Sequence, residues 1–346
     1  MGGPYVKEND IPDELDLALL NALQIAPRAS WRLLAGVLGI SPITAARRWE
    51  QLKAAGLAWV TVCGSLRLLE KTSLAVVAIT ADAGSIQHAA DTLLADPYTV
   101  NIAHTVGNCD LLLFVWTPDL ATFARYVVER LNRLPGVRTV GVSLASEVYS
   151  DGSRWGLQAL DPEQAHSLRK AAPYQEKPAI FRMEDRKLVV ALSHNGRASY
   201  EELGKRVGTS AATARRRLRR VLGDGAYVVR CEMSREISGF PVEVTLWLAT
   251  PPDAAHAVGR RLARLPQTRL CATVVDNSNL VVVLWLRSTG EVQALESQIV
   301  RLAPEVHIAR RALTLRHLKL VNRVLDDGRA GRVVPADVWP SGSTFT

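Results

Sequence analysis

An internal repeat constrains the fold more than any other feature of this sequence, because two similar segments must form the same structural unit. Residues 15–60 align without a gap with residues 184–229 at a constant offset of 169, and 16 of the 45 positions from 16 to 60 are identical. The same offset pairs Ala103 with Ala272 and Trp116 with Trp285. The chain therefore holds a two-part unit of about 130 residues twice, joined by a linker.

The composition narrows the class of protein. With 48% hydrophobic and 22% charged residues, the chain is typical of a globular protein and unlike a disordered one. Its longest apolar runs, such as 280–286, are far shorter than the roughly 20 residues of a membrane-spanning helix. Met1-Gly2-Gly3-Pro4 offers no signal-peptide core, and the four scattered cysteines include no CxxC pair. We predict a cytoplasmic protein without a membrane segment, a metal site or a cofactor.

The first part of each unit has the spacing of three short helices. Apolar residues recur at 15, 19, 20 and 23 and again within 30–38, where Gly39 follows as a helix end. Ser41 then caps a third helix that begins with proline, and Gly56 ends it before an apolar strand or wing at 57–62. This order is typical of a helix-turn-helix domain, whose second helix of the motif enters the DNA major groove.

The capped third helix of each copy carries the candidate DNA contacts. Arginine forks suit phosphates and guanine edges. A basic run is most often only a solvated helix face, but the excess behind the net charge of +8 lies within 15–61 and 184–230, which favours DNA binding. The candidate residues are Ser41, Thr44, Arg47, Arg48, Ser210, Thr213, Arg215, Arg216, Arg217, Arg219 and Arg220.

Position along the helix separates two kinds of contact. Arg47 and Arg216 lie nearer the capped end, where a recognition helix meets base edges. Arg219 and Arg220 lie nearer the C-terminal end, where the helix approaches the DNA backbone, so we expect phosphate contacts there. Because the two helices differ in sequence, we expect an operator that is an imperfect palindrome.

The second part of each unit follows the order βαββαβ, the ferredoxin-like split arrangement. Such a sheet buries one face under its helices, and a matching sheet is the natural cover for the other face. The sequence therefore predicts that the two sheets pack face to face. The expected elements are 74–80, 86–95, 100–106, 110–117, 120–134 and 137–147, and in the second copy 242–250, 254–265, 269–275, 280–286, 291–303 and 306–315.

A capped helix-turn-helix followed by βαββαβ resembles the Lrp/AsnC (feast/famine) family of transcriptional regulators over about 15–148 and 184–316. The residues that carry this resemblance are Asp16, Leu19, Leu20, Leu23, Gln24, Pro27, Arg28, Leu34, Ala35, Leu38, Gly39, Ile40, Ser41, Arg47, Arg48, Leu52, Gly56 and Leu57, with the turn segment 105–112. The resemblance implies a regulator that binds double-stranded DNA through the first module and senses amino acids through the second.

The family usually has one unit per chain and pairs chains through the sheets, so this chain resembles a fused dimer that assembles further into a homo-oligomer. The implied fold class is α+β, with two winged helix-turn-helix domains alternating with two ferredoxin-like βαββαβ sensing domains. The expected domains are 1–62, 63–148, 184–232 and 233–320, with a linker at 149–183 that holds a short helix at 162–171, and a tail at 321–346 that we expect to be loosely ordered after Gly328.

In the family, effectors lie near the turn that follows the second strand of the sensing module. The matching residues are Thr105, Gly107 and Asp110, where a carboxylate suits an ammonium group. Asp276 and Asn279 replace the glycine and the aspartate in the second copy, so we expect effector binding in the first copy. The alternative is that glycine and asparagine serve only hairpin geometry there.

Two other functions remain open from the sequence. Tandem proteins that resemble this family include siroheme decarboxylases, which use histidine and arginine near the sheet. Of the seven histidines only His104 lies in an expected strand beside the turn, and a lone strand histidine is more often structural than catalytic. We therefore predict no catalytic residues and no enzymatic activity. The other alternative is a ligand-sensing coregulator with decayed DNA-binding domains, which the intact serine caps argue against.

Overall fold

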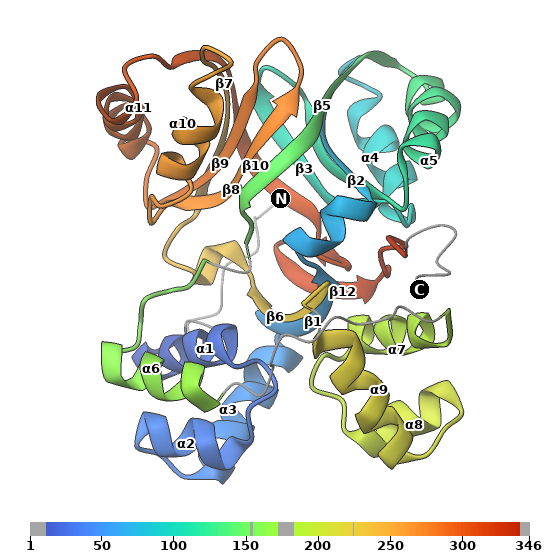
Figure 1. Cartoon of the computed structure of the whole chain (residues 1–346), viewed down its shortest axis with the longest axis vertical. Coiled ribbons are helices and arrows are strands. Elements are labelled where there is room, and N and C mark those ends of the chain that lie inside the picture. Colours follow the sequence, from blue (N-terminus) through green and yellow to red (C-terminus); the bar gives the residue numbers. More distant parts are fainter. Residues whose placement is uncertain (1–11, 153–154, 172–182, 224, 340–346) are drawn as a thin grey trace.

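Two helical domains and two strand-rich domains alternate along the chain, and they occupy opposite ends of the molecule in the computed structural model (Figure 1). The structure describes residues 12–152, 155–171, 183–223 and 225–339. The N-terminal residues that argue against a signal peptide, and parts of the expected linker and tail, lie outside these ranges. None of the described helices is long and apolar enough to span a membrane.

Serine caps and a left-handed glycine define the first helical domain, as predicted. Its elements are α1 (Glu14–Ile25), α2 (Trp31–Leu38), α3 (Pro42–Ala54) and β1 (Ala58–Gly64). The Ser41 hydroxyl accepts a hydrogen bond from the Thr44 backbone N–H at 3.0 Å. Gly39 ends α2 with φ +67°, a conformation that other residues adopt only at a cost. The buried Trp49 and Leu52 fix α3 against α1.

The second helical domain repeats the first. Its elements are α7 (Met183–His194), α8 (Tyr200–Val207), α9 (Ala211–Gly223) and β6 (Tyr227–Met233). Ser210 accepts from the Thr213 N–H, and Gly208 ends α8 with φ +70°. Both predicted three-helix units are therefore present.

The strand expected as a wing in each copy is not free, because it pairs with the equivalent strand of the other copy. β1 and β6 pair with each other, antiparallel, from Ala58 opposite Met233 to Gly64 opposite Tyr227. This two-stranded ribbon joins the two helical domains between the helices and the barrel (Figure 1). The wings thus serve as an internal seam between the copies.

The two βαββαβ domains follow the predicted order. The first contains β2 (Ser73–Ala81), α4 (Ile86–Leu94), β3 (Thr99–Gly107), β4 (Leu111–Thr117), α5 (Leu120–Arg125) and β5 (Val137–Ser150). The second contains β7 (Val242–Ala249), α10 (Ala255–Leu262), β8 (Thr268–Val275), β9 (Leu280–Leu286), α11 (Glu291–Leu302) and β10 (His307–Leu320). The long helix expected at 120–134 is not one α-helix, because a π-helical segment (Tyr126–Arg130) and a 3-10 turn (Leu131–Arg133) follow α5.

The two sheets join at both edges into a closed eight-stranded antiparallel barrel, in the order β10-β3-β4-β2-β5-β8-β9-β7 and back to β10. The faces that the helices leave uncovered meet inside it, where Val76 and Leu112 from the first copy pack in one cluster with Trp247 and Val281 from the second. The expectation of facing sheets holds, and edge pairing between the copies adds to it. Closure leaves both sheets without free edges within the barrel.

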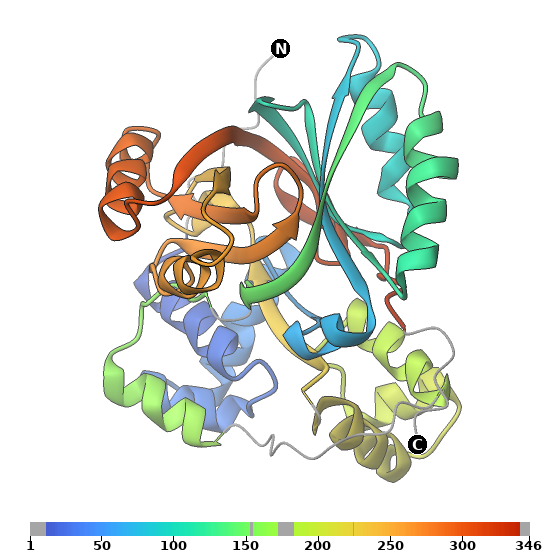
Figure 2. The same ribbon diagram turned by 45° about the horizontal axis from the view of Figure 1, so that its top comes forward.

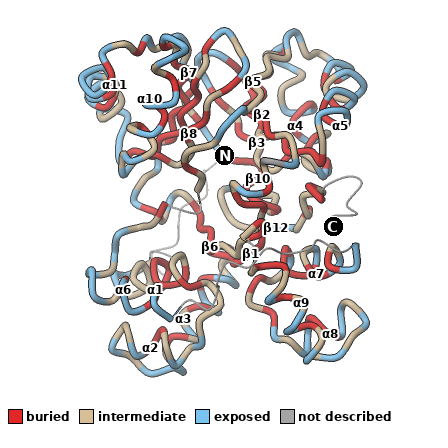
Figure 3. The backbone as a smooth tube through the Cα atoms, in the orientation of Figure 1, coloured by how far each residue is buried: buried red, intermediate tan, exposed pale blue. Residues whose placement is uncertain are grey.

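Helices cover the outside of the barrel on two sides. In Figure 2, α4 and α5 lie against the sheet of the first copy, and α10 and α11 lie against that of the second. Figure 3 shows the strands mostly buried and the outer faces of these helices exposed. Each copy thus keeps its own core in addition to the core they share in the barrel.

The described parts of the linker and the tail contain regular secondary structure. The predicted linker helix is present as α6 (Pro162–Ala171), which packs against α1 and α2 through Leu168. Strands β11 (Arg323–Asp326) and β12 (Arg329–Val333) extend the sheet beyond β10. The expectation of loose order after Gly328 was therefore wrong for the residues of β12. Trp339 then stacks on Tyr227 at 5.6 Å between ring centroids, so burial of its indole orders this segment.

Candidate nucleic-acid interface and ligand cavity

Both recognition helices present exposed arginines along their outer faces. Arg47 on α3 and Arg216 and Arg219 on α9 are exposed, and within the described part of the chain they form no ion pair. Arg215 is also exposed and lies over the Tyr200 ring at 5.8 Å. Ser41 and Ser210 are occupied as caps and hydrogen-bond the hydroxyls of Thr44 and Thr213 at 2.8 and 3.1 Å. The helix ends are thereby fixed and the arginines point outward.

Arg48 has a structural role that the sequence did not reveal. Its Nη1 atom lies 2.8 Å from Oδ2 of Asp13 and 2.9 Å from Oδ1 of Asp16, both at the start of α1. The hydrogen bond that Arg48 donates to Asp16 is the largest influence on the Arg48 pKa and raises it. We therefore remove Arg48 from the expected DNA contacts and assign it to the packing of α3 on α1.

Arg220 is bound even more firmly within its domain. Its guanidinium donates three hydrogen bonds of 2.7–3.1 Å to the carboxylate of Asp185, which is fully buried. Arg217 lies 3.3 Å from Glu184 at the start of α7. The expected phosphate contact of Arg220 is replaced by this bidentate pair, since a buried carboxylate without a partner is strongly unfavourable.

A reciprocal pair of arginines fixes the two helical domains to each other. Arg197 donates from Nη1 to the Pro27 carbonyl at 2.6 Å and from Nη2 to the Ala29 carbonyl at 2.8 Å. Arg28 donates to the Gly196 and Ala198 carbonyls, the equivalent positions at the offset of 169. The repeated Arg-Ala-Ser motif in the sequence is therefore the contact between the copies, and it sets the separation of the recognition helices.

The candidate effector turn of the first copy is held by its own hydrogen bonds. The Thr105 hydroxyl donates to the Cys109 carbonyl at 2.8 Å, and Oδ2 of Asp110 accepts from the Ala81 N–H at 2.9 Å. Gly107 has φ +107°, and a Cβ there would lie 2.7 Å from the Arg311 carbonyl oxygen of β10. The glycine is thus required by backbone geometry and by close approach of the second copy.

The equivalent turn of the second copy has the same framework. Oδ1 of Asn279 accepts from the Thr250 N–H at 3.1 Å, and its Nδ2 donates to the Thr250 carbonyl at 2.8 Å. Thr250 is the repeat equivalent of Ala81, so Asp110 and Asn279 perform one structural task. Asp276, at the position of Gly107, instead accepts from the Ser143 hydroxyl at 2.6 Å and pairs with Arg310.

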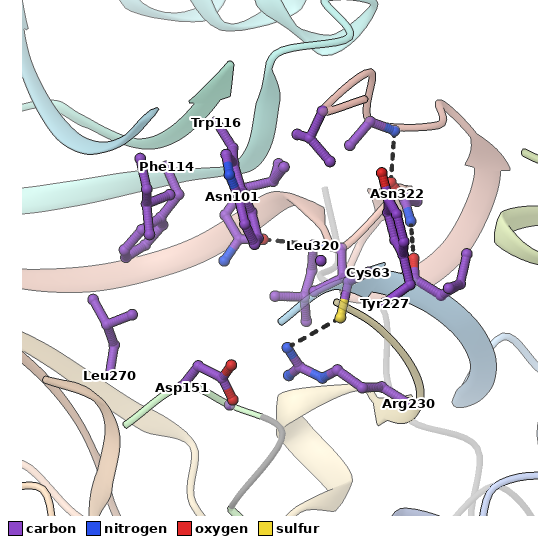
Figure 4. A pocket seen from close by; sticks show the side chains of 18 of the residues that line it. Cys63, Asn101, Phe114, Trp116, Asp151, Tyr227, Arg230, Leu270, Leu320 and Asn322 are labelled. Atoms are coloured by element: carbon purple, nitrogen blue, oxygen red, sulfur yellow. Dashed lines mark hydrogen bonds between the residues drawn. The ribbon is translucent and has the colours of Figure 1, made fainter. Parts of the chain in front are cut away.

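A cavity lies between the β1–β6 ribbon, α7 and the barrel (Figure 4). Its volume is about 130 Å³, and its wall is mainly apolar, with Phe114 and Trp116 on one side. Asp151 and Arg230 lie at the opposite side in the view of Figure 4. Burial raises the pKa of the Cys63 thiol in this wall to about 11, which keeps it protonated near neutral pH.

Charged side chains line this cavity in internally paired sets. Arg230 and Arg269 both pair with the buried Glu232, and Nη2 of Arg269 lies 2.6 Å from it. Oε2 of Glu243 accepts from the Trp285 indole at 2.6 Å and contacts Nε2 of His317 at 3.1 Å. Sequence reasoning missed this network, because its members come from four separate strands; the repeat offset gave no signal for it.

His104, the histidine that the sequence analysis singled out, lies half-buried on β3. Its pKa is lowered, mainly by burial and also by the positive charge of Arg316. His317, on β10, is the histidine that reaches the paired network at the cavity. Within the described ranges, no group of three or more histidine, cysteine, aspartate or glutamate side chains is arranged to hold a metal ion.

These features define a class: a duplicated helix-turn-helix protein whose two βαββαβ domains close one barrel. The AsnC-type helix-turn-helix domain family matches residues 13–53 and 185–221, and the Lrp/AsnC ligand binding domain family matches residues 74–155. The chain is therefore built from Lrp/AsnC family domains, with two helix-turn-helix segments and a ligand-binding domain, as the sequence predicts. No curated protein sequence matches the chain significantly.

The chain is similar to solved structures, and the match to NirDL extends over most of both chains. The siroheme decarboxylase NirDL is 17% identical, with a TM-score of 0.57, and the match covers 91% of this chain and 96% of that one. Escherichia coli AsnC is 19% identical, with a TM-score of 0.36 over 40% of this chain and 93% of that one. A transcriptional regulator of Neisseria meningitidis in complex with L-Met is 22% identical, with a TM-score of 0.36 over 39% and 90%. At these identities the likeness to NirDL concerns the fold.

Proposed function

We propose that this protein is a sequence-specific DNA-binding transcriptional regulator that responds to a small molecule. The observation that carries the proposal is the pair of capped recognition helices with exposed, unpaired arginines, held at a fixed separation by Arg28 and Arg197. Arginine in this position matches guanine edges and phosphates. We further propose that the chain acts without catalysis and as a homo-oligomer.

The test is DNA selection with the full chain followed by mobility shifts on the selected site. The double variant Arg47→Ala, Arg216→Ala should lose about 1–3 kcal/mol of sequence preference for each missing base contact. Arg301→Ala, on the outer helix α11, is the control and should bind like the wild type. Selection that yields no preferred sequence, or equal binding by the double variant, would overturn the proposal.

The proposed effector is an amino acid or related small metabolite at the turn of the first copy. One carboxylate oxygen of Asp110 is occupied by Ala81, and the other is assigned to an ammonium group. Asp110→Ala should abolish a ligand-induced rise in melting temperature. Asn279→Ala is a matched control, since it removes the equivalent bonds to Thr250. Equal loss of the shift in both variants would contradict this assignment.

The second candidate function is that of an enzyme resembling siroheme decarboxylase. The observation that favours it is the cavity with buried Arg230 and Arg269 and the nearby His317, in a fold that matches NirDL over most of both chains. Anaerobic incubation with siroheme, followed by mass spectrometry of the tetrapyrrole, tests it. Loss of carboxyl groups would establish the enzyme, and an unchanged tetrapyrrole beside specific DNA binding supports the regulator.

A further inference from the structure

The two helical domains differ at one surface, the groove between the first two helices of each domain. In the first copy, α6 fills this groove, with Leu168 fully buried and Ala165 nearly so. Gln164 of α6 donates to the Val37 carbonyl at 3.0 Å. In the second copy the equivalent groove, between α7 and α8, has no described segment lying in it (Figure 1).

Polar side chains of α1 also capture the segment that leads into α6. Oδ1 of Asn21 accepts from the backbone N–H of Ala159 at 2.9 Å and of Leu160 at 3.2 Å, and Gln24 accepts from Leu157 at 3.0 Å. Asn21 and Gln24 correspond to Val190 and Ser193 in the second copy. The second groove has therefore lost the groups that hold a connecting segment of the chain.

The groove of the second copy has instead an apolar floor and a basic rim. Val190 is 39% exposed and Met183 is 57% exposed, and both border this groove. Four positions that are apolar in the first copy are basic in the second. These changes are Leu17 to Arg186, Ala18 to Lys187, Ile25 to His194 and Val37 to Arg206.

The changes are confined to one face, because the buried side of α7 keeps the residues of α1. Leu188, Ala191 and Leu192 repeat Leu19, Ala22 and Leu23. A groove with a helix in one copy and with exposed apolar and basic side chains in the other suits a helix of opposite charge. We propose that the α7–α8 groove, lined by Met183, Lys187, Val190, His194 and Arg206, binds an acidic amphipathic helix of a partner protein.

The apolar residues of this partner helix lie on Val190 and Met183, as Leu168 and Ala165 lie on α1 and α2. Its acidic flanks meet Lys187 and Arg206, so salt weakens the complex. Glu184 and the ion-paired Arg186, which contacts Asp337 at 2.6 Å, also border the groove. DNA phosphates would use the basic rim alone and gain nothing from the apolar floor.

The test uses the full chain and a fluorescein-labelled peptide of about 18 residues, helical, with alanine and leucine spaced as Ala165 and Leu168 and glutamates on both flanks. A scrambled peptide of the same composition is the control probe. We expect fluorescence anisotropy to show binding at least about ten-fold tighter for the patterned peptide, a difference of 1.4 kcal/mol or more.

Two variants locate the binding. Val190→Asp and, separately, the double change Lys187→Glu, Arg206→Glu should each weaken the peptide at least about ten-fold. Val128→Asp, at a 59% exposed valine of the π-helical segment Tyr126–Arg130, is the matched control and should bind normally. Circular dichroism confirms folding of each variant. Equal binding of the scrambled peptide, insensitivity to Val190→Asp, or an effect of the rim variant on DNA without one on the peptide would overturn the proposal.

Discussion

Adjacent arginines on α9 have opposite environments. Arg219 is exposed, whereas Arg220 is bound to the buried Asp185. In the first copy the equivalent aspartate, Asp16, is bound by Arg48, which lies about one helical turn earlier along the recognition helix. Both copies thus keep the aspartate, whereas the position of the arginine that pairs with it changes. The identity of an arginine alone therefore does not distinguish a DNA contact from a structural one.

Arg220→Ala should lower the free energy of unfolding by about 3 kcal/mol, because it leaves the Asp185 carboxylate buried without its partner. Arg219→Ala should leave stability unchanged, weaken binding to all DNA sequences, and reduce the salt slope of binding by about one. Urea unfolding and DNA titrations at several salt concentrations measure both effects. Equal destabilisation by the two variants would be inconsistent with this division.

The ionisation of Glu243 should make the free energy of unfolding depend on pH in the acidic range. Burial raises its pKa, but the charge of His317, its hydrogen bond and that of the Trp285 indole outweigh burial, and the pKa falls to about 2 from 4.5. A depressed carboxyl pKa stabilises the fold fully above the unfolded value and loses that stabilisation as the pH falls toward 2.

Glu243→Gln should therefore be less stable than the wild type by up to about 3 kcal/mol at pH 5. The difference should shrink between pH 4.5 and pH 2, where the wild-type carboxylate gains its proton. Urea unfolding of both proteins over this range measures the gap. A gap that stays constant across the range would show that Glu243 does not carry the predicted ionic stabilisation.

At the scale of elements, α3 and α9 have the same caps and different outer faces. At three equivalent positions of the repeat, Ala46, Glu50 and Gln51 of α3 are replaced in α9 by Arg215, Arg219 and Arg220. Since Arg220 is held by Asp185, the additional arginines that the second copy can offer to DNA are Arg215 and Arg219. Two unequal helices at a fixed separation require two unequal half-sites.

The operator should accordingly be an imperfect palindrome. Arg47→Ala should relax base preference in one half-site and Arg216→Ala in the other, each by about 1–3 kcal/mol at the contacted position. Selection from random DNA with each single variant measures the change position by position. A symmetric selected site, or a loss of preference in both half-sites from one substitution, would contradict this assignment.

Local chemistry made the elements predictable. The helix caps at Ser41 and Ser210 and the helix end at Gly39 depend on neighbouring residues, and all three lie where the sequence pattern placed them. Contacts across the chain were not predictable. The ribbon of β1 with β6 joins strands 169 residues apart at equivalent positions, and pattern alone does not choose between a free wing and a paired one.

The same limit applies to the candidate site. Exposed Arg47 and Arg216 follow from helical periodicity, but the partners of Arg48 and Arg220 lie 32 and 35 residues away on another helix. The Arg28 and Arg197 contacts and the network of Glu232, Glu243 and His317 likewise depend on tertiary packing. Sequence reasoning found the surface that local pattern determines and missed the groups that the fold brings together.

At the scale of the whole molecule, the barrel closes within one chain, so its folding is a unimolecular reaction. β5 pairs with β8 and β10 pairs with β3, so both junctions between the copies are intramolecular. Between the two copies along the chain, α6 packs against the outside of the first helical domain. Formation of the barrel therefore does not require a collision between molecules.

The melting temperature should thus stay constant across about a hundred-fold dilution, since an intramolecular equilibrium has no dependence on protein concentration. Differential scanning fluorimetry across that range is the measurement, and size-exclusion chromatography of the same samples identifies any further assembly. A midpoint that falls steadily on dilution would show that association between chains contributes to the stability of the fold.

A barrel completed by one polypeptide also has a genetic consequence. Where two separate subunits make a barrel, a defective product joins sound ones and spoils them, so a damaging allele acts dominantly. Here each barrel takes both halves from its own chain, and a defect in one βαββαβ domain stays within the molecule that carries it. A damaging change in either half therefore costs only the barrel of its own chain.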